Sequence, residues 1–167
     1  LLTPPGTVVE YSNLAMGIAG LVVGRASGQT YREYVDKEIL APLGMTGSVW
    51  TQEAVPAERL ATGYQLLNEQ MQKNRHWRLG AAEGMGGLYS SLNDMGRFVS
   101  FQLSAWPARD EAEAGPVRRS SVREAHLIAG HQPPGGKTFG INWGVSRNPA
   151  LGHLVSHSGG TFLYSAV

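Results

Sequence analysis

The chain has 167 residues, about the length of one domain. Its 14 Lys and Arg residues nearly balance 13 Asp and Glu residues, and a formal net charge of +1 provides no basic footprint for nucleic acid. The absence of cysteine excludes disulfides, thiolate metal sites and a cysteine nucleophile. The longest apolar stretch, residues 14–24, is well below the ~18 residues that a membrane span requires.

The first third of the chain predicts two helices after a short extended run at residues 7–11. Ser12 or Asn13 can cap the first helix, and Gly28 can end it. Its apolar residues recur at helical spacing: Leu14, Ile18, Leu21 and Val22. Thr30 can cap the second helix and Pro42 can end it, with one face formed by Tyr31, Tyr34, Val35 and Ile39.

The middle of the chain has weaker patterns. Short strands are expected near residues 48–50 and 61–64, and the polar residues 65–75 are expected to form a loop. The glycine-rich turn at residues 84–87 precedes a further helix, in which Ser91 and Asp94 have capping-box spacing. The buried face expected for that helix consists of Leu92, Met95, Phe98, Val99 and Leu103.

The last third predicts strands. A surface loop at residues 108–119 and a helix at 121–128 are followed by a turn at 132–136. Three strand-like runs then occupy residues 139–145, 153–157 and 161–167, and a turn at Gly159-Gly160 is expected to join the last two as a hairpin. Helices first and a β-meander last indicate the α+β class, with helices packed on an antiparallel sheet.

The tripeptide Tyr11-Ser12-Asn13 is the first motif that can carry chemistry. Residues i and i+2 of an extended segment point the same way, so Tyr11 and Asn13 can face one cleft. A phenol can relay a proton when nearby positive charge lowers its pKa, and an amide can hold a substrate carbonyl. The structural alternative is a buried tyrosine beside an asparagine that caps the helix.

The second motif, His157-Ser158-Gly159-Gly160, follows a predicted strand. Backbone N–H groups at a tight turn can point at a developing oxyanion, and His157 can donate a hydrogen bond to an anionic group. The structural alternative is an ordinary β-turn with an exposed histidine.

Three other patterns do not support a cofactor or metal. The glycine-rich residues 84–87 can bind an anion, but a structural turn explains them better, because Tyr89 replaces the third glycine of a dinucleotide fingerprint. A phosphate loop ending at residues 135–138 would need glycine where His131 stands. His153 and His157, four apart on a strand, are too distant to share one metal. We therefore expect no cofactor and no metal.

Taken in order along the chain, these pieces resemble the serine β-lactamase-like family of class C β-lactamases, DD-peptidases (penicillin-binding proteins) and related esterases. The matching segments are Pro5-Gly6, Tyr11-Ser12-Asn13, Ser27-Gly28-Gln29-Thr30-Tyr31, Leu40-Ala41-Pro42-Leu43-Gly44-Met45, Gly86-Gly87-Leu88-Tyr89-Ser90-Ser91 with Asp94-Met95, Phe139-Gly140 with Asn142-Trp143-Gly144, and His157-Ser158-Gly159-Gly160. The resemblance implies part of a β-lactamase/transpeptidase-like fold. Residues 1–167 would be the central-to-C-terminal portion of one such domain, truncated at both ends.

The resemblance also implies roles for individual residues. Tyr11 matches the family's proton relay and Asn13 its substrate-binding amide. The segment His157-Ser158-Gly159 matches the strand that contacts substrate, and the Gly160 N–H matches an oxyanion donor. These residues would act on amide or ester bonds through an acyl-enzyme, with a β-lactam, a D-Ala peptide or a small ester as substrate.

Two departures from the family pattern matter. The family's Ser-x-x-Lys, which supplies the nucleophile and a cationic base, does not occur in this chain, so the nucleophile would lie upstream or on a complementing chain. The alternative is an inactive fragment or degenerate homologue that binds peptide or cell-wall ligands. Histidine in place of the family's lysine at His157 favours an esterase or peptidase over an efficient β-lactamase, because histidine is mostly neutral at pH 7. The compartment, whether periplasmic, secreted or cytoplasmic, stays open.

Overall fold

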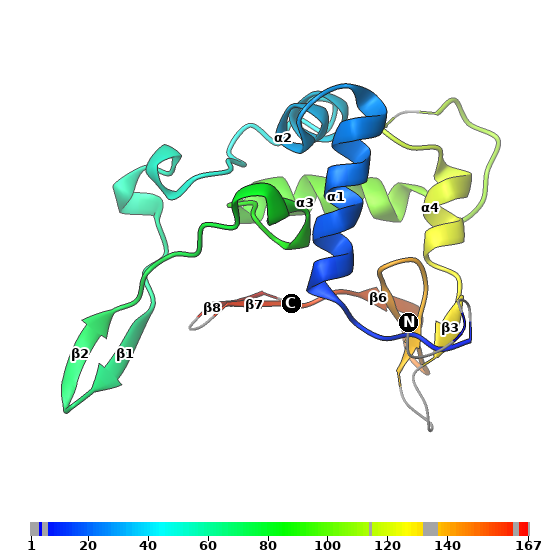
Figure 1. Ribbon diagram of the computed structural model, residues 1–167. Helices are drawn as coiled ribbons and strands as arrows, with labels where there is room; N and C mark the ends of the chain where they lie inside the picture. The colour runs from blue at the N-terminus through cyan, green and yellow to red at the C-terminus, as the bar shows by residue number, and fades with distance from the viewer. Residues whose placement is uncertain (1–3, 5–6, 114, 132–136, 162–163, 167) are drawn as a thin grey trace. The chain divides into compact units, whose positions relative to one another are not determined.

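A computed structural model describes residue 4 and residues 7–113, 115–131, 137–161 and 164–166 (Figure 1). The chain forms two compact units. The first contains the N-terminal residues up to Tyr11 together with Phe101–Ser158, and the second contains Ser12–Ser100 and Gly159–Ala166. The turn expected at residues 132–136 lies outside the described residues.

The second unit begins with helix α1 (Asn13–Ser27), whose two ends agree with the sequence prediction. Ser12 is the N-cap, and its side chain accepts a hydrogen bond from the Ala15 N–H at 3.1 Å. Gly28 ends the helix in the left-handed conformation, with φ of 70°. The run expected to be extended at residues 7–11 forms no strand.

Helix α2 (Tyr31–Val35) starts with a complete capping box. Thr30 accepts from the Glu33 N–H, and the Glu33 carboxylate accepts from the Thr30 N–H at 2.8 Å. The helix continues into a π-helical turn, η1 (Asp36–Leu40), and the chain then turns at Pro42 as expected. The predicted face contributes Val35 to the buried core of this unit, where it clusters with Leu40 and Met45.

The glycine-rich segment packs against α1 and is structural, as its sequence indicated. It forms a 3-10 segment, η4 (Gly80–Met85), that lies along α1. A Cβ atom on Gly84 would lie 2.8 Å from the Met16 carbonyl oxygen and 3.0 Å from Gly20 Cα. Only glycine permits this close approach of two backbones.

Helix α3 (Leu92–Ser104) has the predicted start but a different buried face. The Ser91 Oγ accepts from the Asp94 N–H, whereas the Asp94 carboxylate accepts from the Gly47 N–H and the Ser48 hydroxyl, both at 2.8 Å. The predicted face was wrong for four of its five residues, because Leu92, Met95, Val99 and Leu103 are exposed. The face that does pack carries Asp94, Phe98, Phe101 and, just beyond the helix, Ala105.

A β-hairpin replaces the loop expected at residues 65–75. Strands β1 (Tyr64–Leu67) and β2 (Gln70–Lys73) pair antiparallel, with Leu66 opposite Met71. Asn68 and Glu69 both have positive φ, the backbone of a two-residue type I′ turn. The sequence prediction failed here because it relied on polarity, and an exposed hairpin can be polar on both faces. The strand expected near residue 49 is a single bridge between Val49 and Tyr89. Two short 3-10 segments, η2 (Gln52–Ala54) and η3 (Ala57–Arg59), precede the hairpin.

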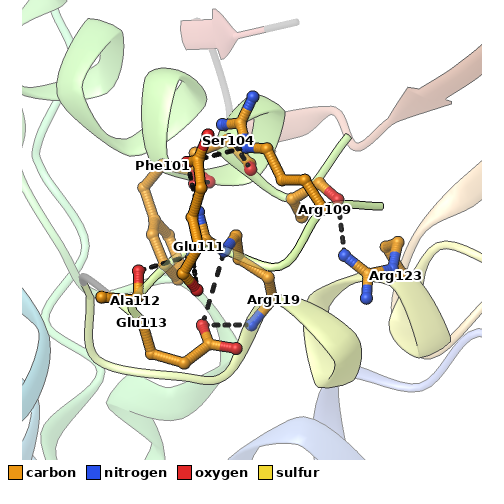
Figure 2. A network of polar contacts seen from close by, with 9 residues as sticks. Phe101, Ser104, Arg109, Glu111, Ala112, Glu113, Arg119 and Arg123 are labelled. Carbon is orange, nitrogen blue, oxygen red and sulfur yellow. Dashed lines mark hydrogen bonds and ion pairs between the residues drawn. The ribbon is translucent and has the colours of Figure 1, made fainter. Parts of the chain in front are cut away.

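In the first unit, a buried arginine organises the predicted surface loop. Arg119 opens helix α4 (Arg119–Ala125), which starts two residues earlier than expected. Its guanidinium donates to the carbonyl oxygens of Glu111 at 2.6 Å and Ala112 at 2.5 Å and forms ion pairs with the Glu111 and Glu113 carboxylates (Figure 2). The Arg119 N–H also donates to the Glu113 carboxylate. One side chain thereby fastens an exposed loop to the helix.

The first unit ends in a four-stranded antiparallel meander, β3 (Gly130–His131), β4 (Thr138–Phe139), β5 (Gly144–Asn148) and β6 (Gly152–Ser156). The strand expected over residues 139–145 is interrupted at Asn142, where φ is 63°. The Gly159-Gly160 turn was a wrong prediction. These glycines lie in β7 (Gly159–Thr161), which pairs with β8 (Tyr164–Ala166) in the second unit. Residues 162–163, which join these strands, lie outside the described residues.

Candidate active site

Within the tripeptide Tyr11-Ser12-Asn13, Tyr11 belongs to the first unit and Ser12 and Asn13 belong to the second. Ser12 caps α1, so Asn13 is the first residue of the helix and its exposed side chain is not the cap. Tyr11 is 61% exposed. Both parts of the structural alternative, a buried tyrosine and an asparagine cap, are therefore wrong. The side chains that carry the motif are accessible to a ligand.

The first unit brings Tyr11 to His157, although they come from opposite ends of the chain. Their ring centroids are 6.3 Å apart and the rings are tilted by 45°. His157 directly follows β6 and is exposed. A phenol is a side chain that can transfer a proton, and an imidazole is one that can donate a hydrogen bond to an anion.

Trp143 packs against the His157 ring of this pair. Its ring lies edge-on to His157, with centroids 6.5 Å apart and an interplanar angle of 87°. It belongs to the bend between β4 and β5 that follows Asn142. No site role is predicted for Trp143 from the sequence, although its place in the motif Asn142-Trp143-Gly144 is a signal for one.

A buried histidine, His126, also contacts Trp143. The two rings meet edge-to-face, and their centroids are 5.6 Å apart. The Trp106 indole N–H donates to His126 Nδ1 at 3.1 Å, so the ring proton lies on Nε2 and is donated to the Gln102 Oε1 at 3.0 Å. Burial lowers the pKa of His126, and the nearby His153 lowers it further. His126 is thus a neutral, oriented imidazole that supports Trp143.

The remaining predicted residues lie along the next segment. Ser158 ends the first unit, and Gly159 and Gly160 begin the described part of β7 in the second. All three are exposed. In an antiparallel pair, the backbone N–H and C=O groups of successive residues point alternately toward the partner strand and away from it. Some backbone amides of β7 therefore point away from β8. The position of Asn13 and the two glycines relative to Tyr11 and His157 stays a prediction.

Within the described ranges, no group of three or more His, Asp or Glu residues has the arrangement of a metal site. No helix in the part of the chain that the structure describes is long and apolar enough to cross a membrane.

The described residues combine helices with antiparallel sheets, and the likeness to solved structures shows that this is the β-lactamase/transpeptidase-like fold. The model of the beta-lactamase family matches residues 1–167. The chain belongs to the beta-lactamase family, which confirms the family and the α+β fold class expected from the sequence.

Among curated proteins, the chain is similar to Protein Rv1367c of Mycobacterium tuberculosis, with 26% identity over 181 residues that cover 99% of this chain and 44% of the relative. It is also similar to the D-alanyl-D-alanine-carboxypeptidase/endopeptidase AmpH of Escherichia coli, with 28% identity over 149 residues that cover 86% of this chain and 36% of the relative. The chain therefore spans less than half the length of these relatives.

Among solved structures, the octameric penicillin-binding protein homologue from Pyrococcus abyssi has a TM-score of 0.79 and 27% identity, covering 98% of this chain and 36% of its own. The D-amino acid amidase from Ochrobactrum anthropi, in complex with L-phenylalanine amide, has a TM-score of 0.66 and 25% identity, covering 91% of this chain and 43% of its own.

Proposed function

We propose that the chain is the central-to-C-terminal portion of a serine hydrolase domain that cleaves amide or ester bonds through an acyl-enzyme. The observation that carries the proposal is the accessible pair of Tyr11 and His157 in a member of the beta-lactamase family. The substrate is a β-lactam, a D-Ala peptide or a small ester. The similarity to a D-alanyl-D-alanine-carboxypeptidase/endopeptidase and to a D-amino acid amidase supports the amide substrates within this range.

Each predicted residue has a distinct role in this proposal. Tyr11 relays the proton between nucleophile and leaving group, and Asn13 holds the substrate carbonyl. His157, Ser158 and Gly159 contact the substrate, and the Gly160 N–H donates to the oxyanion that develops on the attacked carbonyl. The serine nucleophile with its lysine is supplied by residues outside these 167, because no Ser-x-x-Lys occurs among them.

That same absence favours a second candidate, an inactive homologue that binds peptide or cell-wall ligands. Intact mass spectrometry of the protein from its native source, before and after treatment with a fluorophosphonate or a penicillin, separates the two. A protein heavier than 17.9 kDa that gains one adduct supports the serine hydrolase. A mass that matches 17.9 kDa, with no adduct, supports the binding protein.

Tyr11→Phe tests the proton relay in the protein that forms the adduct. Loss of a general base typically reduces turnover by about 10²–10⁴-fold. Tyr64→Phe is the matched control, because Tyr64 is an exposed tyrosine on β1. Near-normal turnover of the Tyr11→Phe protein would contradict the assigned role.

A further inference from the structure

Tyr164, on β8, has a bonded hydroxyl at a place where no site residue was predicted. The Gly63 N–H donates to the Tyr164 Oη at 2.7 Å, and the Tyr164 Oη lies 3.2 Å from His76 Nε2. Because the phenol oxygen accepts from Gly63, its own hydrogen is available to a neutral His76. All three residues belong to the second unit.

His76 lies close to two tyrosine rings. Its ring centroid is 5.0 Å from that of Tyr164 and 5.6 Å from that of Tyr89. Tyr89 in turn exchanges two backbone hydrogen bonds with Val49, both of 2.8 Å. The imidazole therefore has a fixed place in the unit, and the Tyr164 hydroxyl is attached to that place.

Gly63 is equally well fixed. It is buried, it directly precedes β1, and its carbonyl accepts from the Asn74 N–H at 2.9 Å, which closes the base of the β1–β2 hairpin. Its N–H is left to bond Tyr164. Two hydrogen bonds thus connect β8 to both chain segments at the base of that hairpin.

Among the described residues, strand β7 pairs with β8. Its pairing with β8 places Thr161 opposite Tyr164 and Gly160 opposite Ser165. Gly159 and Gly160 have no side chains to pack. Even a Cβ on Gly159 would meet nothing within 4 Å, and one on Gly160 would meet only the Tyr164 carbonyl oxygen at 3.9 Å. A two-stranded hairpin without such an attachment is at best marginally stable in water.

We infer that Tyr164 is a positioning residue that fixes the Gly159–Gly160 strand through its hydrogen bonds to Gly63 and His76. The inference deepens the proposed function, on which it rests for the role of Gly160 as oxyanion donor. Tyr164 itself touches neither substrate nor nucleophile in this scheme. It determines where the Gly160 amide is held.

Hydrogen exchange of the backbone amides in Tyr164→Phe tests the positioning itself. The variant keeps the ring and loses both hydrogen bonds, each worth about 1 kcal/mol net, so we expect exchange in β7 and β8 to accelerate by about tenfold or more. Exchange at Val35 and Leu40, in the core of the same unit, should not change. Equal exchange in variant and wild type overturns the inference, and so does uniform acceleration that includes the core.

A pair of variants at His76 gives an independent test if Tyr164→Phe fails to fold. Gln at position 76 can still bond a phenol, whereas Leu cannot. We expect His76→Gln to retain slow exchange in β7 and β8, and His76→Leu to lose it. Equal behaviour of the two variants overturns the inference.

The rate at which a fluorophosphonate phosphonylates the serine of the adduct-forming protein separates this inference from the proposed function. In that reaction the serine oxygen bonds to phosphorus and fluoride leaves, and the oxyanion donor contacts the phosphonyl oxygen. Removal of a single oxyanion donor costs about 10²–10³-fold. A displaced donor should therefore slow phosphonylation by about tenfold or more, with little change in substrate KM. Faster exchange with slower phosphonylation supports both claims. Faster exchange with unchanged phosphonylation supports the positioning by Tyr164 but overturns Gly160 as the oxyanion donor.

Discussion

His126 is a buried imidazole whose two nitrogens are both committed to hydrogen bonds. Protonation of Nδ1 would place one N–H group against the Trp106 N–H. Burial first, and His153 second, lower the pKa of His126 in the folded state below the ordinary ~6.5. Above that ordinary pKa the folded and unfolded chains both hold neutral histidine. As pH falls below it, the unfolded chain takes up a proton first, and stability is lost toward the folded-state pKa.

We therefore expect the free energy of unfolding to fall between pH 7.5 and pH 5, and His126→Gln to remove part of that fall. Urea unfolding of wild type and His126→Gln at pH 7.5 and pH 5 measures how much of the pH-dependent loss of stability the substitution removes. His153→Gln should keep most of the pH dependence, because burial is the larger cause of the shift. An identical pH dependence in wild type and His126→Gln would contradict the assignment.

Arg119 is the second residue whose burial has a testable consequence. Arg119→Met removes the hydrogen bonds that the buried, charged guanidinium donates to the carbonyls of Glu111 and Ala112, and we expect a loss of about 1–3 kcal/mol in the free energy of unfolding. The loop at residues 108–118 should also become sensitive to trypsin. Arg78→Met removes an exposed pair with Glu53 and should cost little, because exposed ion pairs contribute about 0–1 kcal/mol. Equal effects of the two substitutions would show that burial of Arg119 does not matter.

At the scale of elements, two glycines give opposite predictions. Gly84→Ala forces a Cβ to within 2.8 Å of the Met16 carbonyl oxygen, and overpacking of this kind costs about 1–3 kcal/mol. Gly96→Ala, within α3, meets nothing within 4 Å and should stabilise the helix by about 0.5–1 kcal/mol. Thermal unfolding of both variants gives the comparison. The same direction of change in Tm for both would contradict the packing of η4 on α1.

The elements that the sequence predicted best are those with local signals. Ser12, Gly28 and Thr30 act through hydrogen bonds or a backbone conformation within a few residues, so their motifs suffice. The buried face of α3 depends on which residues other segments supply, and periodicity does not reveal that Gly47 and Ser48 bind Asp94. The Gly159-Gly160 pair looks like a turn locally, yet its pairing with β8 makes it a strand.

In the candidate site too, residues in local sequence motifs are predictable, whereas residues that matter through long-range contacts are not. The motifs containing Tyr11 and His157 were found from short sequence patterns, and the first unit places those two rings together. Short sequence patterns do not point to Trp143 or Tyr164, because the contacts of Trp143 with His157 and of Tyr164 with His76 are formed only in the fold. An isolated aromatic residue in a sequence does not indicate which ring or amide it will meet.

At the scale of the whole molecule, the apolar surface of α1 is the dominant unexplained feature. The side chain predicted to begin its apolar row, Leu14, is 73% exposed, and Ile18, Leu21 and Val22 are exposed with it. The last three line an open hollow of about 490 Å³ together with Arg25 and Ala26. Contiguous exposed apolar surface of this kind marks an interaction site or an aggregation liability.

We expect residues 1–167, when produced as a separate chain, to self-associate through this face, because association removes the exposed aliphatic side chains from water. Ile18→Gln combined with Val22→Gln keeps good helix formers in α1 and removes two of those side chains, so it should weaken association by about tenfold or more. Sedimentation velocity over a range of concentrations gives the measurement. Leu66→Gln, on the exposed β1–β2 hairpin, is the control and should leave association unchanged. A chain that stays monomeric at all concentrations, or an equal effect of the two changes, would show that the α1 face does not drive association.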